Sequence, residues 1–253
     1  MNATASAAEV RPLYEHGCNQ RPTYAADLPG FGHAERSHRP YTIRLMTDAV
    51  HDLVGWIAAR HEGRPVDVLA VSLSVEFAVR AAVEAPESIR RLALVSPTGM
   101  NGKQLRHGSA EAPRGPPWLR RALIDRRWSP GLYRILTRPG VVRYFLNGTW
   151  GSKAIDETMW RYGVRSTKEP GAEYAPLYFV CGALFAADSG TLYEALQQPV
   201  WVSHGIRGDF ADYRAGALLQ DRPNWRFDAL PTGALPYFEM RAEFNARLDA
   251  FLD

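Results

Sequence analysis

The chain has 253 residues, of which 46% are hydrophobic and 23% charged, and its formal net charge is +3. This composition allows one sizeable hydrophobic core and excludes a globally disordered chain, while the small charge gives no indication of nucleic-acid binding. No apolar run reaches the roughly 18 residues of a membrane span, and residues 1–16 lack the basic and apolar regions of a secretory signal. We therefore expect a cytoplasmic protein in which Cys18 and Cys181 are free thiols, with no metal-binding spacing of cysteine or histidine.

Short apolar runs alternate with helical patterns along the chain. The apolar runs predict strands at 24–30, 66–72, 91–97, 199–205 and 224–230. Helical periodicity predicts helices at 42–61 with Thr42 as N-cap, at 75–84 and at 238–252. This order predicts an α/β fold: a mostly parallel, doubly wound sheet with helices on both faces. Functional residues of such sheets lie just past the carboxyl ends of the strands, which here are followed by Ser72, Pro97, Asp209 and Ala234.

The segment 98–190 has a different composition from the rest of the chain. It is rich in proline, glycine, arginine and aromatic residues, and its periodicity is weak. We interpret it as a helical lid inserted between two strands. The predicted organisation is then a first part of the core at 1–97, the lid at 98–190, and a second part of the core at 191–253.

Ser72 ends an apolar run and precedes a helical pattern. A nucleophilic serine at a strand-to-helix turn needs small residues two positions before and after it, because the turn is very tight. Ala70 and Ser74 are both small, so the turn is sterically allowed without the usual glycines. The alternative is a strand that simply ends in serine.

Four segments closely resemble the α/β-hydrolase superfamily in order and spacing: DLPGFGHAER (27–36), VLAVSLSVEFAVRAAVEAPESIRRLALVSPTGM (68–100), PVWVSHGIRGDF (199–210) and TGALPYFE (232–239). The resemblance extends from residue 5 onward, and the insertion lies where that family has its lid. It implies that Ser72 is the nucleophile, that the Leu73 backbone N–H is an oxyanion donor, and that Asp209 is the triad acid with Asp212 as a second candidate. A solvated loop carboxylate is the alternative for both aspartates.

The resemblance places the catalytic histidine at position 234, where this chain has alanine. Because alanine cannot accept the serine proton, the ordinary triad is incomplete. Among the seven histidines, His33 and His107 are the candidates for a replacement base. The others are expected to be solvated or structural, namely His16, His38, His51, His61 and His204.

The start of the chain is also unlike the family. Residues 1–23 contain no strand-like run, and the strand that normally lies between those assigned to 24–28 and 66–71 is missing. Its absence would leave ladder N–H and C=O groups without partners. Either the two strands close up directly, or the chain is a shortened copy of a longer protein; we favour the second explanation.

Residues 118–145 combine basic and aromatic side chains. The basic residues are Arg120, Arg121, Arg126, Arg127, Arg134, Arg138 and Arg143, against a single acid, Asp125. We favour an ordinary lid whose arginines are solvated and whose aromatic residues line a pocket. Peripheral contact with an anionic membrane, or entry of an acidic or lipid-like substrate, is the less favoured alternative, and no nucleic-acid partner is expected.

Together these features predict a serine hydrolase acting on an ester or similar acyl bond of an apolar small molecule, with activity impaired by Ala234. The alternative is a non-catalytic protein of the same fold that binds a small apolar ligand or a partner. Neither hypothesis requires a cofactor or a metal. The substrate and the oligomeric state are left open by the sequence.

Overall fold

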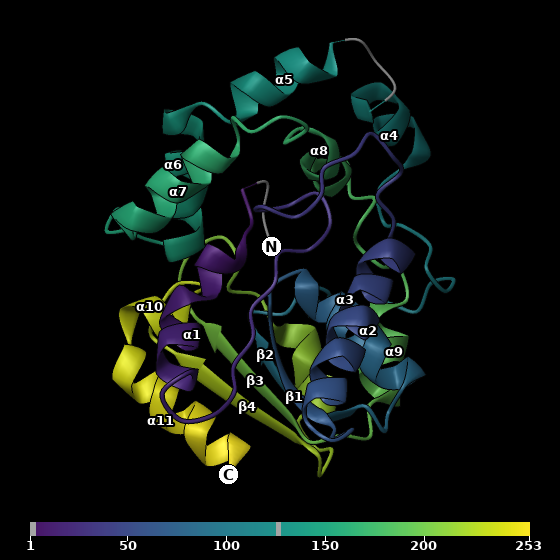
Figure 1. The fold of residues 1–253 in the computed structure, drawn as a ribbon, viewed down its shortest axis with the longest axis vertical. Helices are drawn as coiled ribbons and strands as arrows, with labels where there is room; N and C mark the ends of the chain where they lie inside the picture. The colour runs from purple at the N-terminus through teal and green to yellow at the C-terminus, as the bar shows by residue number, and fades with distance from the viewer. Residues whose placement is uncertain (1–3, 125–127) are drawn as a thin grey trace.

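A computed structural model describes residues 4–124 and 128–253. Its sheet has four parallel strands in the order β1-β2-β3-β4 (Figure 1): Val66–Val71, Ile89–Val95, Val200–Gly205 and Trp225–Leu230. Four of the five predicted strands are therefore confirmed, with β2 beginning two residues earlier than predicted. Because the strands are buried by helices, their sequences are nearly continuous apolar runs.

Helices cover both faces of the sheet (Figure 1), which confirms the predicted doubly wound α/β architecture. One apolar core lies between the sheet and the elements α2 (Ile43–Arg60), α3 (Ser74–Glu84), α9 (Ser189–Ala195) and η2 (Arg214–Leu219). The other lies against η1 (Ala7–Val10), α1 (Arg11–Gly17), α10 (Pro236–Glu239) and α11 (Arg241–Leu252). The predicted last helix is thus divided at Met240.

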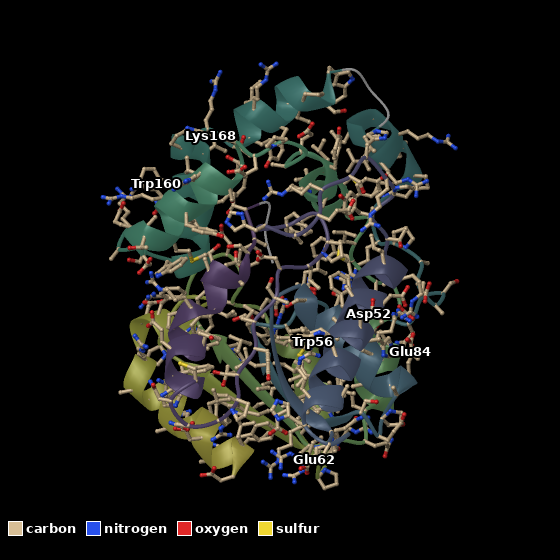
Figure 2. The ribbon with its side chains drawn as sticks, viewed as in Figure 1. Asp52, Trp56, Glu62, Glu84, Trp160 and Lys168 are labelled. Carbon is tan, nitrogen blue, oxygen red and sulfur yellow. The ribbon has the colours of Figure 1, made fainter. Side chains whose placement is uncertain are left out.

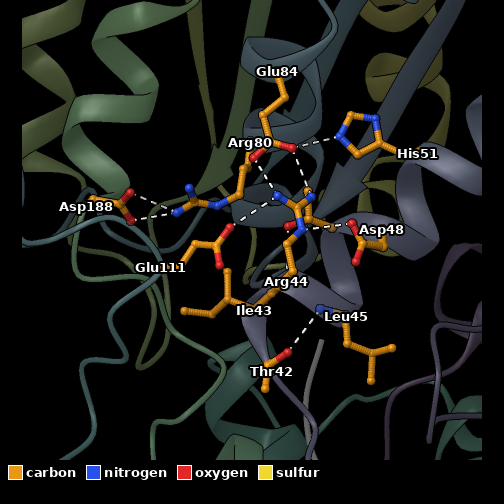
Figure 3. Close-up of polar contacts among 11 residues, drawn as sticks. Thr42, Ile43, Arg44, Leu45, Asp48, His51, Arg80, Glu84, Glu111 and Asp188 are labelled. Atoms are coloured by element: carbon orange, nitrogen blue, oxygen red, sulfur yellow. Dashed lines mark hydrogen bonds and ion pairs between the residues drawn. The ribbon is translucent and has the colours of Figure 1, made fainter.

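The predicted cap of α2 is present. The Thr42 hydroxyl oxygen accepts a hydrogen bond from the Leu45 backbone N–H at 3.1 Å (Figure 3). This contact satisfies one of the N–H groups that the first turn of a helix leaves without a partner.

The strand predicted at 24–30 is wrong, because this segment pairs with no strand in the structure. Instead, the Asp27 carboxylate accepts hydrogen bonds from the backbone N–H groups of Ala7 (2.6 Å) and His33 (2.8 Å), which shapes a loop. The segment therefore does not close up against β1. Within the described residues, β1 has a neighbouring strand on one side only.

A cavity of about 560 Å³ lies along this free edge of β1, between the strand, α2 and the N-terminal segment. The N–H groups of Val66 and Ser72 bond toward β2, to Ser88 and Val95. Since the direction of backbone bonding alternates along a strand, the N–H groups of Asp67 and Leu69 point away from β2 toward the cavity, whereas that of Val71 bonds to the Ser74 hydroxyl.

Among the described residues, five further helices follow β2 and precede β3 in the sequence, and they form the upper half of the molecule (Figure 1): α4 (Pro117–Ile124), α5 (Ser129–Leu136), α6 (Pro139–Trp150), α7 (Glu157–Ser166) and α8 (Tyr174–Val180). We call this part the insertion. None of the helices in the described ranges is both long and apolar enough to cross a bilayer. Both cysteines are free; Cys18 is exposed, and Cys181 is buried within the insertion.

Buried polar contacts join the base of the insertion to α3. Arg80 on α3 pairs with Asp188 at 2.7 Å (Figure 3), and both side chains are nearly inaccessible to solvent. Glu76, one turn earlier, is paired with Arg114 and accepts the Ala186 backbone N–H at 2.7 Å. The helix that follows Ser72 is thus tied to both the beginning and the end of the insertion.

Candidate active site

Ser72 lies at a tight turn between β1 and α3. Its φ is +57°, in the left-handed region that non-glycine residues rarely occupy. Its backbone N–H donates to the Val95 carbonyl at 2.8 Å, which ties the turn to the end of β2. A strained serine between a parallel strand and a helix is the geometry of a nucleophile elbow.

Ser74 closes this turn from the helix side. Its hydroxyl donates to the Val71 carbonyl at 2.8 Å, and its oxygen accepts the Val71 N–H at 3.1 Å. The residue that stands in place of the usual glycine therefore holds the turn together through its side chain. Ala70 on the other side is buried and small enough for the close approach.

Two groups at the turn are without hydrogen-bond partners in the described part of the chain: the Ser72 hydroxyl and the Leu73 backbone N–H. Ser72 is half-buried, whereas the Leu73 side chain is fully buried beside Phe31 and Phe77. A backbone N–H at the start of a helix is a suitable donor to a developing negative charge.

Asp209 follows β3 and is exposed. Its backbone N–H donates to the Gly148 carbonyl on α6 at 3.0 Å. Its carboxylate lies against the same glycine, since a Cβ at position 148 would be 2.1 Å from Asp209 Oδ2. The candidate acid is thus held beside the insertion, and no histidine contact accompanies it among the described residues.

Asp212, the second candidate acid, is engaged elsewhere. It pairs with Arg214 at 2.9 Å and accepts the Gly102 backbone N–H at 3.0 Å. The hydrogen bond from Arg214 and the two backbone hydrogen bonds from Gly102 and Arg214 hold the pKa of this carboxyl well below its usual range. These contacts fit a solvated loop carboxylate better than a partner of Ser72.

Ala234, at the position where the resemblance expects a histidine, is buried beneath the end of α6. Its N–H donates to the Thr149 carbonyl at 2.8 Å, and its carbonyl accepts from the Ser96 hydroxyl at 2.7 Å. The preceding Gly233 packs so closely that a Cβ there would lie 2.5 Å from the Trp150 backbone. The C-terminal end of α6 therefore contacts the loops after both β3 and β4.

All seven histidines contact groups other than Ser72 and Asp209. Three pair with carboxylates: His16 with Asp249, His51 with Glu84, and His107 with Glu194. The other four contact aromatic or phenolic groups: His33 with Tyr162, His38 with Tyr174, His61 with Tyr24, and His204 with Tyr213. Neither candidate replacement base, His33 or His107, is brought to Ser72 by these contacts.

A polar cluster that the sequence did not reveal lies next to this region, at the ends of β2 and β3. Ser96 has a φ of +47°, and its hydroxyl donates to the Ala234 carbonyl. The His204 ring stacks on Tyr213 with centroids 4.0 Å apart. Burial raises the pKa of Tyr213 to about 12 and lowers the pKa of His204, so both side chains are neutral at pH 7. Nothing in the sequence indicated a role for Tyr213, because this residue lies outside the segments with helical or strand periodicity.

No group of three or more histidine, cysteine, aspartate or glutamate side chains that could hold a metal ion occurs within residues 4–124 and 128–253.

Known structures resemble the whole of this chain. A meta-cleavage product hydrolase from Pseudomonas fluorescens IP01 has a TM-score of 0.72 and 15% identity, over 98% of this chain and 86% of that one. A 2-hydroxy-6-oxo-6-phenylhexa-2,4-dienoate hydrolase from Rhodococcus sp. strain RHA1 has a TM-score of 0.71 and 16% identity, over 100% of this chain and 87% of that one. An esterase from Exiguobacterium antarcticum has a TM-score of 0.72 and 11% identity, over 99% of this chain and 89% of that one.

These likenesses confirm the predicted α/β-hydrolase fold for this chain. At such low identity they concern the fold and not the reaction. No protein-family model matches the sequence, and no curated protein matches it.

Proposed function

We propose that the protein is a serine hydrolase-like protein whose Ser72 is acylated by esters of apolar small molecules, and that the absence of a histidine at position 234 makes its turnover slow. The observation that carries the proposal is the left-handed Ser72 with an unengaged hydroxyl, followed by the unengaged Leu73 N–H. A serine is held in this strained conformation when the surrounding structure requires it there.

The proposed reaction has two steps. The Ser72 oxygen attacks the ester carbonyl carbon while the Leu73 N–H stabilises the negative charge on the carbonyl oxygen. The bond to the alkoxy group breaks, the alcohol leaves with the serine proton, and an ester of Ser72 remains. Water then cleaves that ester, releasing the carboxylic acid and restoring the hydroxyl.

Both steps are expected to be slow because, within residues 4–124 and 128–253, no side chain is hydrogen-bonded to the Ser72 hydroxyl to take its proton. Loss of the base from a serine triad leaves a residual acceleration of roughly 10³–10⁴ over water. Since water attack on the acyl-serine also needs a base, we expect the acylated protein to accumulate.

Incubation with a short-chain nitrophenyl ester followed by intact-mass measurement tests this proposal. We expect one acyl group per chain, located on Ser72 by peptide mapping, with little further turnover. Ser72→Ala should lose the adduct. Ser96→Ala is the matched control, because Ser96 is also left-handed but its hydroxyl is already bonded to the Ala234 carbonyl.

Absence of any adduct on the folded wild-type protein would favour the second candidate, a non-catalytic binder of a small apolar ligand. That alternative is supported by the close packing of α6 on Gly233 and Ala234, where the base would otherwise lie.

A further inference from the structure

The outer surface of the insertion exposes a group of large apolar side chains. They lie on α4, α5 and α6 and just before α5: Trp118, Trp128, Ile135, Tyr144 and Phe145. Trp118 is 67% exposed and Tyr144 72%. Exposure of several large apolar residues within one short segment marks an interaction surface rather than random variation.

Arginines without ion pairs accompany these side chains. Arg120, Arg121, Arg134 and Arg138 form no ion pair among the described residues, whereas Arg143 is neutralised by Glu157 at 2.7 Å. No acidic residue occurs in 112–124 or 128–155. Asp125, Arg126 and Arg127 belong to the same stretch of sequence but lie outside the described residues.

Helices α4 and α5 lie in the upper half of the molecule, away from the sheet (Figure 1), and the apolar and basic side chains named above are exposed there. In α4, Trp118 and Arg121 are three positions apart, a spacing that places both on one side of the helix. Arg134 lies on α5, and Arg138 lies in the link between α5 and α6; both are exposed. The opposite sides are buried, as Leu123 and Tyr133 show. We call the exposed surface formed by Trp118, Arg121, Arg134, Ile135 and Arg138 the lid face.

We propose that the lid face binds the surface of an anionic lipid bilayer. Arginines without partners match negatively charged headgroups, and each basic residue near such a surface strengthens binding about fivefold. Tryptophan and other large apolar side chains at the same level insert at the boundary between headgroups and acyl chains. The hypothesis favoured from the sequence, solvated arginines with aromatic residues lining a pocket, does not account for the exposure of Trp118, Tyr144 and Phe145.

Co-sedimentation of the full chain with vesicles tests the proposal. We expect binding to vesicles of phosphatidylcholine with phosphatidylserine at about 0.1 M salt and little binding to phosphatidylcholine alone. Raising the salt to about 1 M should release the protein, because the screening length falls from roughly 10 to 3 Å. The double variant Arg134→Gln/Arg138→Gln should bind about 30-fold more weakly, and Trp118→Ala should also weaken binding.

A matched control is available on the other half of the molecule. Trp56 on α2 is 47% exposed, like Trp128, and the Arg60 guanidinium lies 3.3 Å above its ring. Figure 2 places Trp56 in the half with the sheet, and Trp160 and Lys168 of the insertion in the other half. The double variant Trp56→Ala/Arg60→Gln should bind like the wild type, as should Ser72→Ala, so this test is independent of the proposed reaction.

Three results would overturn the proposal for the folded protein. They are no binding to anionic vesicles, equal binding to neutral ones, and an equal loss in the Trp56→Ala/Arg60→Gln variant. Tighter binding to a duplex oligonucleotide than to anionic vesicles at the same salt would assign the lid face to nucleic acid instead.

Discussion

The turn at Ser72 and the loops after β3 and β4 face the same end of the sheet but are organised differently. The turn keeps a strained serine whose hydroxyl contacts no other group in the described structure. At the loops, Asp209 and Ala234 are bonded to the end of α6 through their backbones. The turn and the two loops are therefore held by different interactions, so each can be changed without the other.

The largest expected effect concerns the attachment of α3 to the insertion. Asp188→Ala would leave Arg80 buried without its partner and should lower the free energy of unfolding by about 3–5 kcal/mol. Urea denaturation measures the change. Arg64→Ala, in the exposed pair with Glu62, should change it by less than about 1 kcal/mol. Similar values for the two variants would show that the buried pair does not hold the turn in place.

The packing of α6 beside Ala234 can be tested by adding a single methyl group at Gly233. Gly233→Ala should cost about 1–3 kcal/mol of unfolding free energy, because the added Cβ would meet the Trp150 backbone at 2.5 Å. Gly140→Ala is the control within α6, since a Cβ there meets no atom within 4 Å. It should be neutral or stabilising. If the Gly233→Ala variant is as stable as the wild type, the end of α6 does not seal this loop.

Strain at Ser72 predicts a smaller effect. Because glycine tolerates a positive φ, Ser72→Gly should be more stable than Ser72→Ala by about 1 kcal/mol in thermal or urea unfolding. At Ser74, which is helical, the order should reverse, with glycine less stable than alanine. If the glycine variant is more stable than the alanine variant at both positions, or less stable at both, the strained conformation of Ser72 is contradicted.

The smallest expected effect is a dependence of stability on pH. Burial lowers the pKa of His204 in the folded protein, so the unfolded chain takes up a proton at higher pH than the folded one. The contribution of His204 to stability is therefore complete above the unfolded pKa of about 6.5 and is lost as the pH falls below it. His204→Gln should flatten this part of the curve of unfolding free energy against pH, and a curve that is unchanged in this variant would contradict the role assigned to His204.

Local sequence patterns were sufficient to predict the turn at Ser72. An apolar run, small residues at 70 and 74 and a helical pattern all lie within a short segment, and each signal depends only on its neighbours. Residues 24–30 show where such patterns fail. Their composition suited a strand, but a strand also needs a partner, and here the Asp27 carboxylate binds the local backbone instead.

The contacts of α6 could not be predicted from the sequence. They join Gly148 to Asp209 and Thr149 to Ala234 across more than fifty residues, and they depend on glycines that allow backbones to approach closely. The stacking of Tyr213 on His204 likewise depends on how the loop after β3 folds back on the strand. Spacing along the chain contains no information on either contact.

The central claim, a serine at a nucleophile elbow without a general base, is tested most directly by the pH dependence of Ser72 phosphonylation with a fluorophosphonate. We predict that the rate, followed by intact mass with Ser72→Ala as the blank, rises continuously between about pH 6 and 9. A plateau above a pKa near 7 would reveal a histidine acting as the base. Such a plateau, or a folded protein that is never labelled at Ser72, would contradict the account.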